Sequence, residues 1–397
     1  MRATISRQAG MPSTLRALAP LLAAVFLLDA LTTLVVVGYG NSYLLSTLHA
    51  PPSYPGYALA IYGLVKLLSA PAGGRILDGR AAPLLPVASG ACALAGLGVI
   101  LATGSANGFL GGVAALSAGI ALAWLVVFHS LGHTSDPERR GEATAFMGLI
   151  SGAASVTGLG LAALFSLSSY WRLPFALGCA LALAGALVLR RLPLRGELRP
   201  SAIRRMGAPA VTAPGPSLRV LTVVFAHFAV GTGAVAACVP FALHTLNLSL
   251  VEAFVLLGPA IGCGALAMLI AGRRSQANGR FGEVIVLYAI ASVALAAAGV
   301  APGALAFGLI AIPIAASLAA AAPVINAALI DSARAGALPG TALGALFFAE
   351  GLGTVAGPAA TSLVIQALNT RWAMVALGVF AACLALFIAI QRRRNRL

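Results

Sequence analysis

Four ionisable side chains lie inside long apolar segments of the 397-residue chain. They are Asp29, Lys66, His227 and Glu350. A charge near the centre of a lipid bilayer costs at least about 2.5–3.5 kcal/mol, so each of them requires a physical reason. Carboxyl and imidazole groups bind and release protons, and a buried lysine neutralises an acid or attracts an anion. These residue types therefore indicate proton transfer or the recognition of a charged solute.

Asp29 and Lys66 lie at similar depths in consecutive apolar segments, each near the middle of a bilayer. We expect them to form a buried ion pair, because pairing lowers the cost of burying both charges. Thr32 and Thr33 share the helical face of Asp29, and Tyr62 lies one turn from Lys66. The pair either only fixes helix packing or forms a proton or substrate site that is exposed when it opens.

The other two ionisable residues each have two readings. His227 is either a neutral, hydrogen-bonded core residue or a group that changes charge near physiological pH. Glu350 has no partner suggested by the sequence, and it is either a second proton site or a protonated packing residue. Trp124 and Asn326 are further candidates for the lining of a cavity.

The composition limits the elements that can position these residues. Apolar residues make up 60% of the chain and charged residues 9%, whereas a soluble domain has about 25% charged residues. This excludes soluble enzymes and nucleic-acid-binding domains. The five cysteines show no CxxC spacing, so we expect no disulfide and no metal site. The nucleotide-binding Walker A motif is absent, and we expect no cofactor.

A membrane-spanning helix needs about 20 mostly apolar residues. The sequence predicts an all-α membrane protein with twelve such spans: 17–38, 56–74, 83–103, 108–131, 142–166, 171–190, 218–243, 250–271, 282–301, 304–330, 339–366 and 372–391. Of the 25 Lys and Arg residues, 22 fall in alternate loops and at the two ends. This asymmetry predicts that both termini are cytoplasmic.

Residues 191–217 are rich in Arg and Pro and predict a cytoplasmic linker between two six-helix halves, residues 1–190 and 218–397. The halves show signs of duplication at a spacing of 198 residues, which pairs Asp29 with His227. Related loops follow the second and eighth spans. The residues that we expect to gate the contact between the halves are Gly74, Asp78, Arg80, Gly272, Gly279 and Arg280.

The chain resembles the major facilitator superfamily in helix count, linker position and this loop motif. The resemblance implies two bundles related by a pseudo-twofold axis, with Asp29 and His227 facing a central cavity from opposite halves. It also implies that Asp78 and arginines across the contact hold one face closed. In a departure from proton-coupled drug exporters, the fourth span has no arginine. The Gly-Pro motif usual in helix five of many antiporters occurs instead in the eleventh span, at Gly357-Pro358.

The leading hypothesis is a secondary transporter, not an enzyme, that exports small amphipathic or hydrophobic solutes by proton-coupled alternating access. A similarity to proton-coupled glycolipid flippases rests on Asp29, Trp124 and His227, although Lys66 replaces the acid expected in the second span. An importer of organic anions that binds a carboxylate at Lys66 is another alternative, as is a non-transporting membrane sensor. We expect a multi-pass monomer in the cell membrane whose partners are the solute, protons and lipids.

Overall fold

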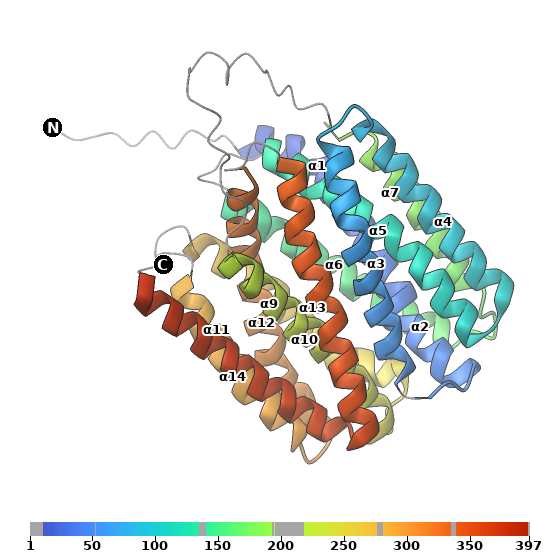
Figure 1. Cartoon of the computed structure of the whole chain (residues 1–397). Helices are drawn as coiled ribbons and strands as arrows, with labels where there is room; N and C mark the ends of the chain where they lie inside the picture. The colour runs from blue at the N-terminus through green and yellow to red at the C-terminus, as the bar shows by residue number, and fades with distance from the viewer. Residues whose placement is uncertain are drawn as a thin grey trace, which may run out of the picture.

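The computed structural model describes residues 11–51, 53–134, 140–192, 194, 218–275, 281–334 and 339–395 (Figure 1). All regular elements within these ranges are helical, in agreement with the predicted class. The long helices are α1 (Met11–Thr32), α3 (Tyr54–Leu77), α4 (Leu85–Thr103), α5 (Ala106–Thr134), α6 (Arg140–Ser166), α7 (Leu173–Leu189), α9 (Leu218–Pro240), α10 (Leu250–Ser275), α11 (Phe281–Gly299), α12 (Ala304–Arg334), α13 (Pro339–Ala367) and α14 (Thr370–Asn395). After α1, the same span continues through a π-helical stretch (Thr33–Gly38), α2 (Tyr39–Ser42) and a second π-helical stretch (Tyr43–Thr47).

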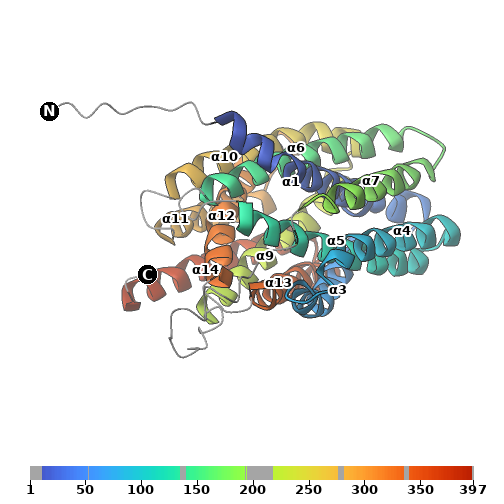
Figure 2. The same ribbon diagram turned by 90° about the horizontal axis from the view of Figure 1, so that it is seen from above.

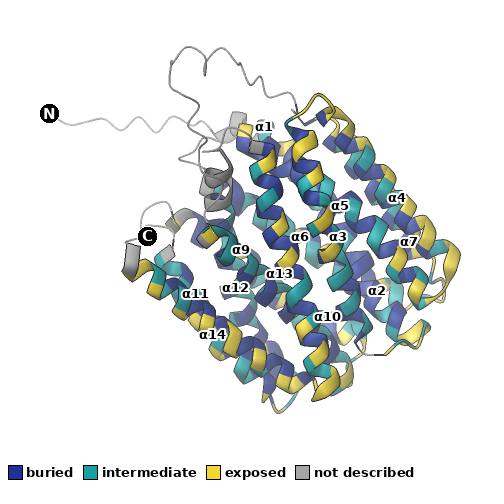
Figure 3. Ribbon diagram, in the orientation of Figure 1, coloured by how far each residue is buried: buried dark blue, intermediate teal, exposed yellow. Residues whose placement is uncertain are grey.

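These helices coincide with the twelve predicted spans. Ten of them are long and apolar enough to cross a membrane by length and hydropathy. The other two are α7, which is shorter, and α3, which carries Lys66 and Arg75. Large apolar side chains are exposed along the outer helices α4, α7, α11 and α14 (Figure 3). Lipid, rather than water, is the solvent that suits such a surface, so the chain is a multi-pass membrane protein.

The ends of the first and seventh spans repeat each other at the spacing expected from the sequence. Both finish in a π-helical stretch, Tyr43–Thr47 in one and Phe241–Thr245 in the other. Each is followed by a residue in the left-handed region, His49 (φ 51°) and Asn247 (φ 53°). The aromatic contacts Tyr43–Phe109 and Phe241–Phe307 also lie 198 residues apart. This recurrence supports an internal duplication.

Two pairs of helices make the most extensive contacts between the first half of the chain and the second. Helix α3 lies beside α13, and α6 lies beside α10 (Figures 1 and 2). Small residues allow the close approach: a Cβ atom added to Gly63 would lie 2.6 Å from the backbone of Thr354, and one added to Gly152 would lie 2.4 Å from the Ala265 side chain. Because the backbones almost touch, polar side chains on facing helices are brought together.

Candidate functional site

The packing of α3 against α13 brings Lys66 and Glu350 together. The ammonium group of Lys66 forms a buried salt bridge with Oε1 of Glu350. The two residues are only 3% and 7% exposed. The predicted Asp29–Lys66 ion pair is therefore wrong, and the structure supplies the partner of Glu350 that the sequence did not suggest. All three residues lie at a similar depth in their spans, so depth does not distinguish the two acids. The close contact between α3 and α13 decides which acid faces the lysine.

Aromatic rings complete the surroundings of the Lys66 ammonium. It lies 4.7 Å from the ring centroid of Phe347 and 5.8 Å from that of Phe228. Phe128 packs edge-on against Phe347, and Trp124 contacts Phe128. Ring faces attract cations, so this cluster lowers the cost of a buried ammonium. Sequence analysis missed Phe347, although its position one turn before Glu350 was an available signal.

Asp29 lies close to this pair without taking part in it. Its carboxyl group is within electrostatic range of both Lys66 and Glu350, and it hydrogen-bonds with Ser151 of α6. Its Oδ2 atom is buried and has no hydrogen-bond partner. The Tyr62 side chain lies within electrostatic range of both carboxyl groups. The structure thus gathers two acids and one cation from helices α1, α3 and α13, with Ser151 as a contact that the sequence did not reveal.

The contact between α1 and α6 continues beyond Asp29. One turn further along both helices, the Thr33 hydroxyl donates a hydrogen bond to Ser155, at 3.4 Å. Thr32, in contrast, bonds the Leu28 carbonyl of its own helix at 2.8 Å. Another turn along, Val37 and Leu159 reach a cavity. Two polar pairs, Asp29–Ser151 and Thr33–Ser155, therefore lead from the carboxyl group of Asp29 to one helical turn from that cavity.

The cavity has a volume of about 300 Å³ and is lined by both halves of the chain. The first half contributes Val37 and Leu159, and the second contributes α9, α10 and α12. Its wall is apolar and contains no charged residue. At Gly231, a Cβ atom would meet nothing within 4 Å, so this wall is open to added atoms. An apolar cavity of about half this size can hold benzene, so this one has room for a small aromatic molecule.

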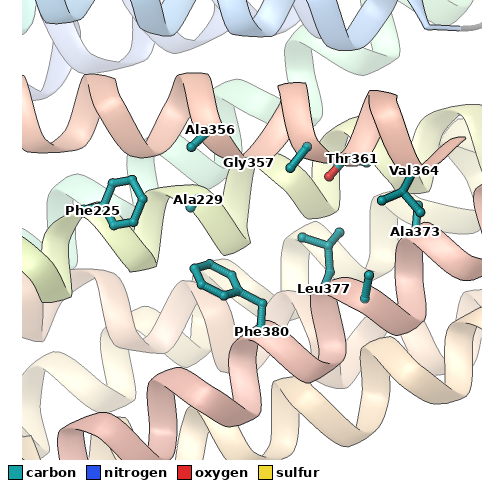
Figure 4. A pocket seen from close by; sticks show the side chains of 11 residues that line it. Phe225, Ala229, Ala356, Gly357, Thr361, Val364, Ala373, Leu377 and Phe380 are labelled. Atoms are coloured by element: carbon teal, nitrogen blue, oxygen red, sulfur yellow. The ribbon is translucent and has the colours of Figure 1, made fainter. Parts of the chain in front are cut away.

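A second cavity, of about 200 Å³, lies between α9, α13 and α14 (Figure 4). Phe225, Leu377 and Phe380 line it, together with Thr361, whose hydroxyl oxygen is buried without a partner. All of its lining residues belong to the second half of the chain. A rearrangement of one half against the other would therefore not open or close it directly, which distinguishes it from the cavity between the halves.

His227 is held within the second half. Its Nδ1 atom hydrogen-bonds with the Tyr288 hydroxyl of α11, and its ring packs edge-on against Phe228. Phe228 in turn faces Lys66, so His227 is one ring away from the ion pair. Asn326 is partly buried on α12. It is not among the residues that line either of these two cavities.

At one end of α3, Asp78 joins the two halves. Its carboxylate accepts hydrogen bonds from the backbone N–H groups of Gly340 and Thr341, at 2.8 and 2.7 Å, and from the Thr341 hydroxyl. These groups form the first turn of α13, where free N–H groups and the helix dipole favour an anion. Gly74 packs directly against the Gly340 backbone. The predicted gate acid thus binds a helix N-terminus across the contact, rather than arginines, in the part of the chain described.

The other predicted gate residues differ in their surroundings. Arg80 is exposed, and Gly272 is buried near the end of α10. Gly279 and Arg280 lie outside the described residues.

Replacing Asp78 tests its contact with α13. Asp78→Ala removes three hydrogen bonds, and we expect it to destabilise the packed state by about 1 kcal/mol, the usual cost of losing a helix cap. The change is measured as a lower midpoint temperature of unfolding, Tm, in detergent. Arg80→Ala is the control and should leave Tm unchanged because Arg80 is exposed. Equal Tm values for wild type and Asp78→Ala would contradict the role of the cap.

Comparisons with known proteins agree with this architecture. The sequence profile of the Major Facilitator Superfamily matches residues 21–338. No curated protein sequence matches the chain significantly. Among solved structures, the human organic anion transporter MFSD10 (TETRAN) superposes with a TM-score of 0.71 and 16% identity, over 95% of this chain and all of the other. The proton:xylose symporter XylE gives the same TM-score and identity, over 95% of both chains. The chain belongs to the major facilitator superfamily.

Proposed function

We propose that the protein is a proton-coupled secondary transporter that exports small amphipathic or hydrophobic solutes. Membership of the superfamily supports transport rather than enzymatic catalysis. In this proposal, residues 1–190 and 218–397 form two bundles related by a pseudo-twofold axis. They open in turn to the two sides of the cell membrane, with both termini in the cytoplasm. The protein works as a monomer and needs no cofactor.

The observation that carries the proposal is the apolar cavity between the halves. Both halves contribute to its wall, so a rearrangement of one half against the other changes its access, as alternating access requires. Its apolar wall suits a solute that leaves water readily and makes few hydrogen bonds. The two polar pairs between α1 and α6, Asp29–Ser151 and Thr33–Ser155, place a buried acid two helical turns from the cavity wall at Val37.

The proton coupling is assigned to Asp29, with Lys66 and Glu350 as its neighbours. Ionisable groups deep in a membrane commonly mark proton or ion pathways. Asp29 is not committed to a salt bridge, and one of its oxygens has no partner, so the carboxyl group is available to bind and release a proton. His227 is an auxiliary group in this proposal.

The experiment uses purified protein in liposomes that enclose a pH-sensitive dye. A proton gradient is imposed, and three probes are added in turn: a lipophilic aromatic cation, a neutral aromatic molecule and an aromatic carboxylate. We expect proton flux that depends on one of the first two. If the protein is folded and none of the three probes changes the flux, the proposal of proton-coupled transport of such solutes is wrong.

Filling the cavity tests its role. Gly231→Leu adds an apolar side chain where a Cβ atom meets nothing within 4 Å, so the helix itself should tolerate the change. The added side chain occupies solute space, so a bound solute would be overpacked against it. Overpacking of this kind costs about 1–3 kcal/mol. We therefore expect transport of the responding probe to fall about tenfold or more at low concentration.

The matched control is Gly98→Leu, which also meets nothing within 4 Å but lies on an exposed face of α4. It should transport at the wild-type rate. Equal transport by both variants would remove the cavity from the proposal.

Transport of an organic anion is a second candidate, because Lys66 carries a buried ammonium group. A solute carboxylate could take the place of Glu350 if that residue were protonated. A solved structure with the same fold is described as an organic anion transporter, although its sequence is only 16% identical. A response to the aromatic carboxylate alone in the liposome experiment would favour this candidate over export of apolar solutes.

A further inference from the structure

Thr361 supplies a polar side chain to the wall of the cavity between α9, α13 and α14. It is 3% exposed, and its hydroxyl oxygen is buried without a hydrogen-bond partner. Thr232 on α9 and Thr354 on α13 instead donate to the carbonyl four residues earlier in their own helices, at 2.6 and 2.9 Å. Such a bond within the helix is the common way to satisfy a threonine hydroxyl. Thr361 therefore has a free hydroxyl where its neighbours on the same two helices have none.

The hydroxyl group of Thr361 is directed away from its own helix. Figure 4 shows its oxygen pointing from the α13 ribbon toward Leu377 of α14. On the facing helix α9, a Cβ atom added to Gly233 would lie 3.1 Å from this oxygen. The glycine thus leaves α9 without a side chain that would cover the hydroxyl. A buried hydroxyl without a partner is costly, and a ligand that accepts its hydrogen bond recovers that cost.

The rest of the cavity wall is apolar and partly aromatic. The rings of Phe225 and Phe380 line it, together with aliphatic side chains such as Leu377 and Val364. No charged residue lines it within the part of the chain described, so a charged ligand would lose its hydration without compensation. Its volume of about 200 Å³ exceeds the roughly 150 Å³ of an apolar cavity that binds benzene. The space therefore suits one neutral aromatic ring with a small substituent.

The cavity is accessible from the outer surface of the helices. Ala360 of α13 and Ala376 and Phe380 of α14 line it and are also exposed. Exposed apolar residues on the outer helices of a membrane protein face lipid. A ligand therefore enters from the bilayer, where neutral aromatic molecules concentrate because they leave water readily.

We propose that this cavity is a binding site for a neutral aromatic molecule that carries one carbonyl oxygen and enters from the lipid bilayer. The Thr361 hydroxyl donates a hydrogen bond to the carbonyl oxygen, and the ring of the ligand packs against Phe225 and Phe380. All of the lining residues belong to the second half of the chain. A rearrangement of the two halves therefore leaves this wall together. The site is separate from the cavity between the halves to which transport is assigned.

Fluorine NMR of the purified protein in lipid nanodiscs tests the site. The probe is para-fluoroacetophenone, and the matched probe is para-fluoro-α-methylstyrene, which has a terminal methylene group in place of the carbonyl oxygen. We expect saturable binding of the carbonyl probe that excess unlabelled acetophenone displaces, and weaker binding of the matched probe. Thr361→Val keeps the shape of the side chain and removes the hydroxyl. It should weaken binding of the carbonyl probe about two- to tenfold and leave that of the matched probe unchanged.

Two controls separate this site from the rest of the protein. Gly231→Leu fills the cavity between the halves and should bind both probes as wild type does. Thr361→Val without ligand should have a Tm equal to or above that of wild type, because the hydroxyl that it removes has no partner.

Four results would overturn the proposal. They are the absence of saturable binding in wild type, loss of binding in Gly231→Leu, equal affinity of wild type and Thr361→Val for the carbonyl probe, and a lower Tm in Thr361→Val. The last of these would show that the hydroxyl already has a structural partner. None of these measurements depends on proton flux, so the outcome of the liposome experiment does not affect them.

Discussion

Lys66→Met is expected to be the most destabilising single substitution in the polar centre of this protein. The change leaves Glu350 buried beside Asp29 without a cation, and breaking a buried ion pair by removing one partner costs about 3–5 kcal/mol. It also removes the cation within electrostatic range of Asp29. We expect a large loss of folded protein on purification and a markedly lower Tm in the fraction that survives.

The double variant Lys66→Met with Glu350→Gln should recover much of this stability, because two neutral groups replace the pair. The pH dependence of Tm in Lys66→Met distinguishes the loss of a charge interaction from the loss of packing. In Lys66→Met, a buried carboxyl group must hold a proton in the folded state, and folding takes up that proton more easily as the pH falls. The difference in Tm between Lys66→Met and wild type should therefore become smaller as the pH falls from 8 to 5. A deficit that does not change with pH, and that the double variant shares, would show that the lysine contributes packing rather than charge.

The helices could be predicted from the sequence because they depend on local properties. Hydropathy within about 20 residues determines whether a segment can span a membrane. The spacing of 198 residues noted in the sequence also separates the π-helical stretches Tyr43–Thr47 and Phe241–Thr245. Lys66 and Arg75 lowered the apolar character of α3, but its length and neighbours still identified it as a span.

The ion pair could not be predicted in the same way. Lys66 and Glu350 are 284 residues apart, and depth alone made Asp29 an equally good partner. The choice depends on the rotation of each helix about its axis and on the close contact between α3 and α13. That contact is made by small residues such as Gly63 and Gly351, but the chain has 45 glycines, so glycine spacing does not identify which helices meet. Hydroxyl residues are also common in membrane helices, so residue type alone did not identify Ser151 as the contact of Asp29.

Asp29→Asn is expected to abolish proton coupling while leaving the fold intact. The Lys66–Glu350 salt bridge does not involve Asp29, and an asparagine side chain can keep the hydrogen bond with Ser151. The substitution therefore removes a proton-binding group and little else. In liposomes, solute-dependent proton flux should fall to the level of protein-free vesicles. Exchange of labelled for unlabelled solute across the membrane, which needs no net proton movement, should continue.

The control for Asp29→Asn is Thr32→Val, one turn away on the same helix. The Thr32 hydroxyl bonds the carbonyl of Leu28 rather than any group of the site, so its loss should affect neither flux nor exchange. Loss of both activities in Asp29→Asn, with Tm unchanged, would place Asp29 in solute recognition instead of proton coupling. Retention of both would make it a packing residue. Selective loss of flux is the result that requires a titrating carboxyl group at this position, because asparagine matches aspartate in size and differs in its inability to bind and release a proton.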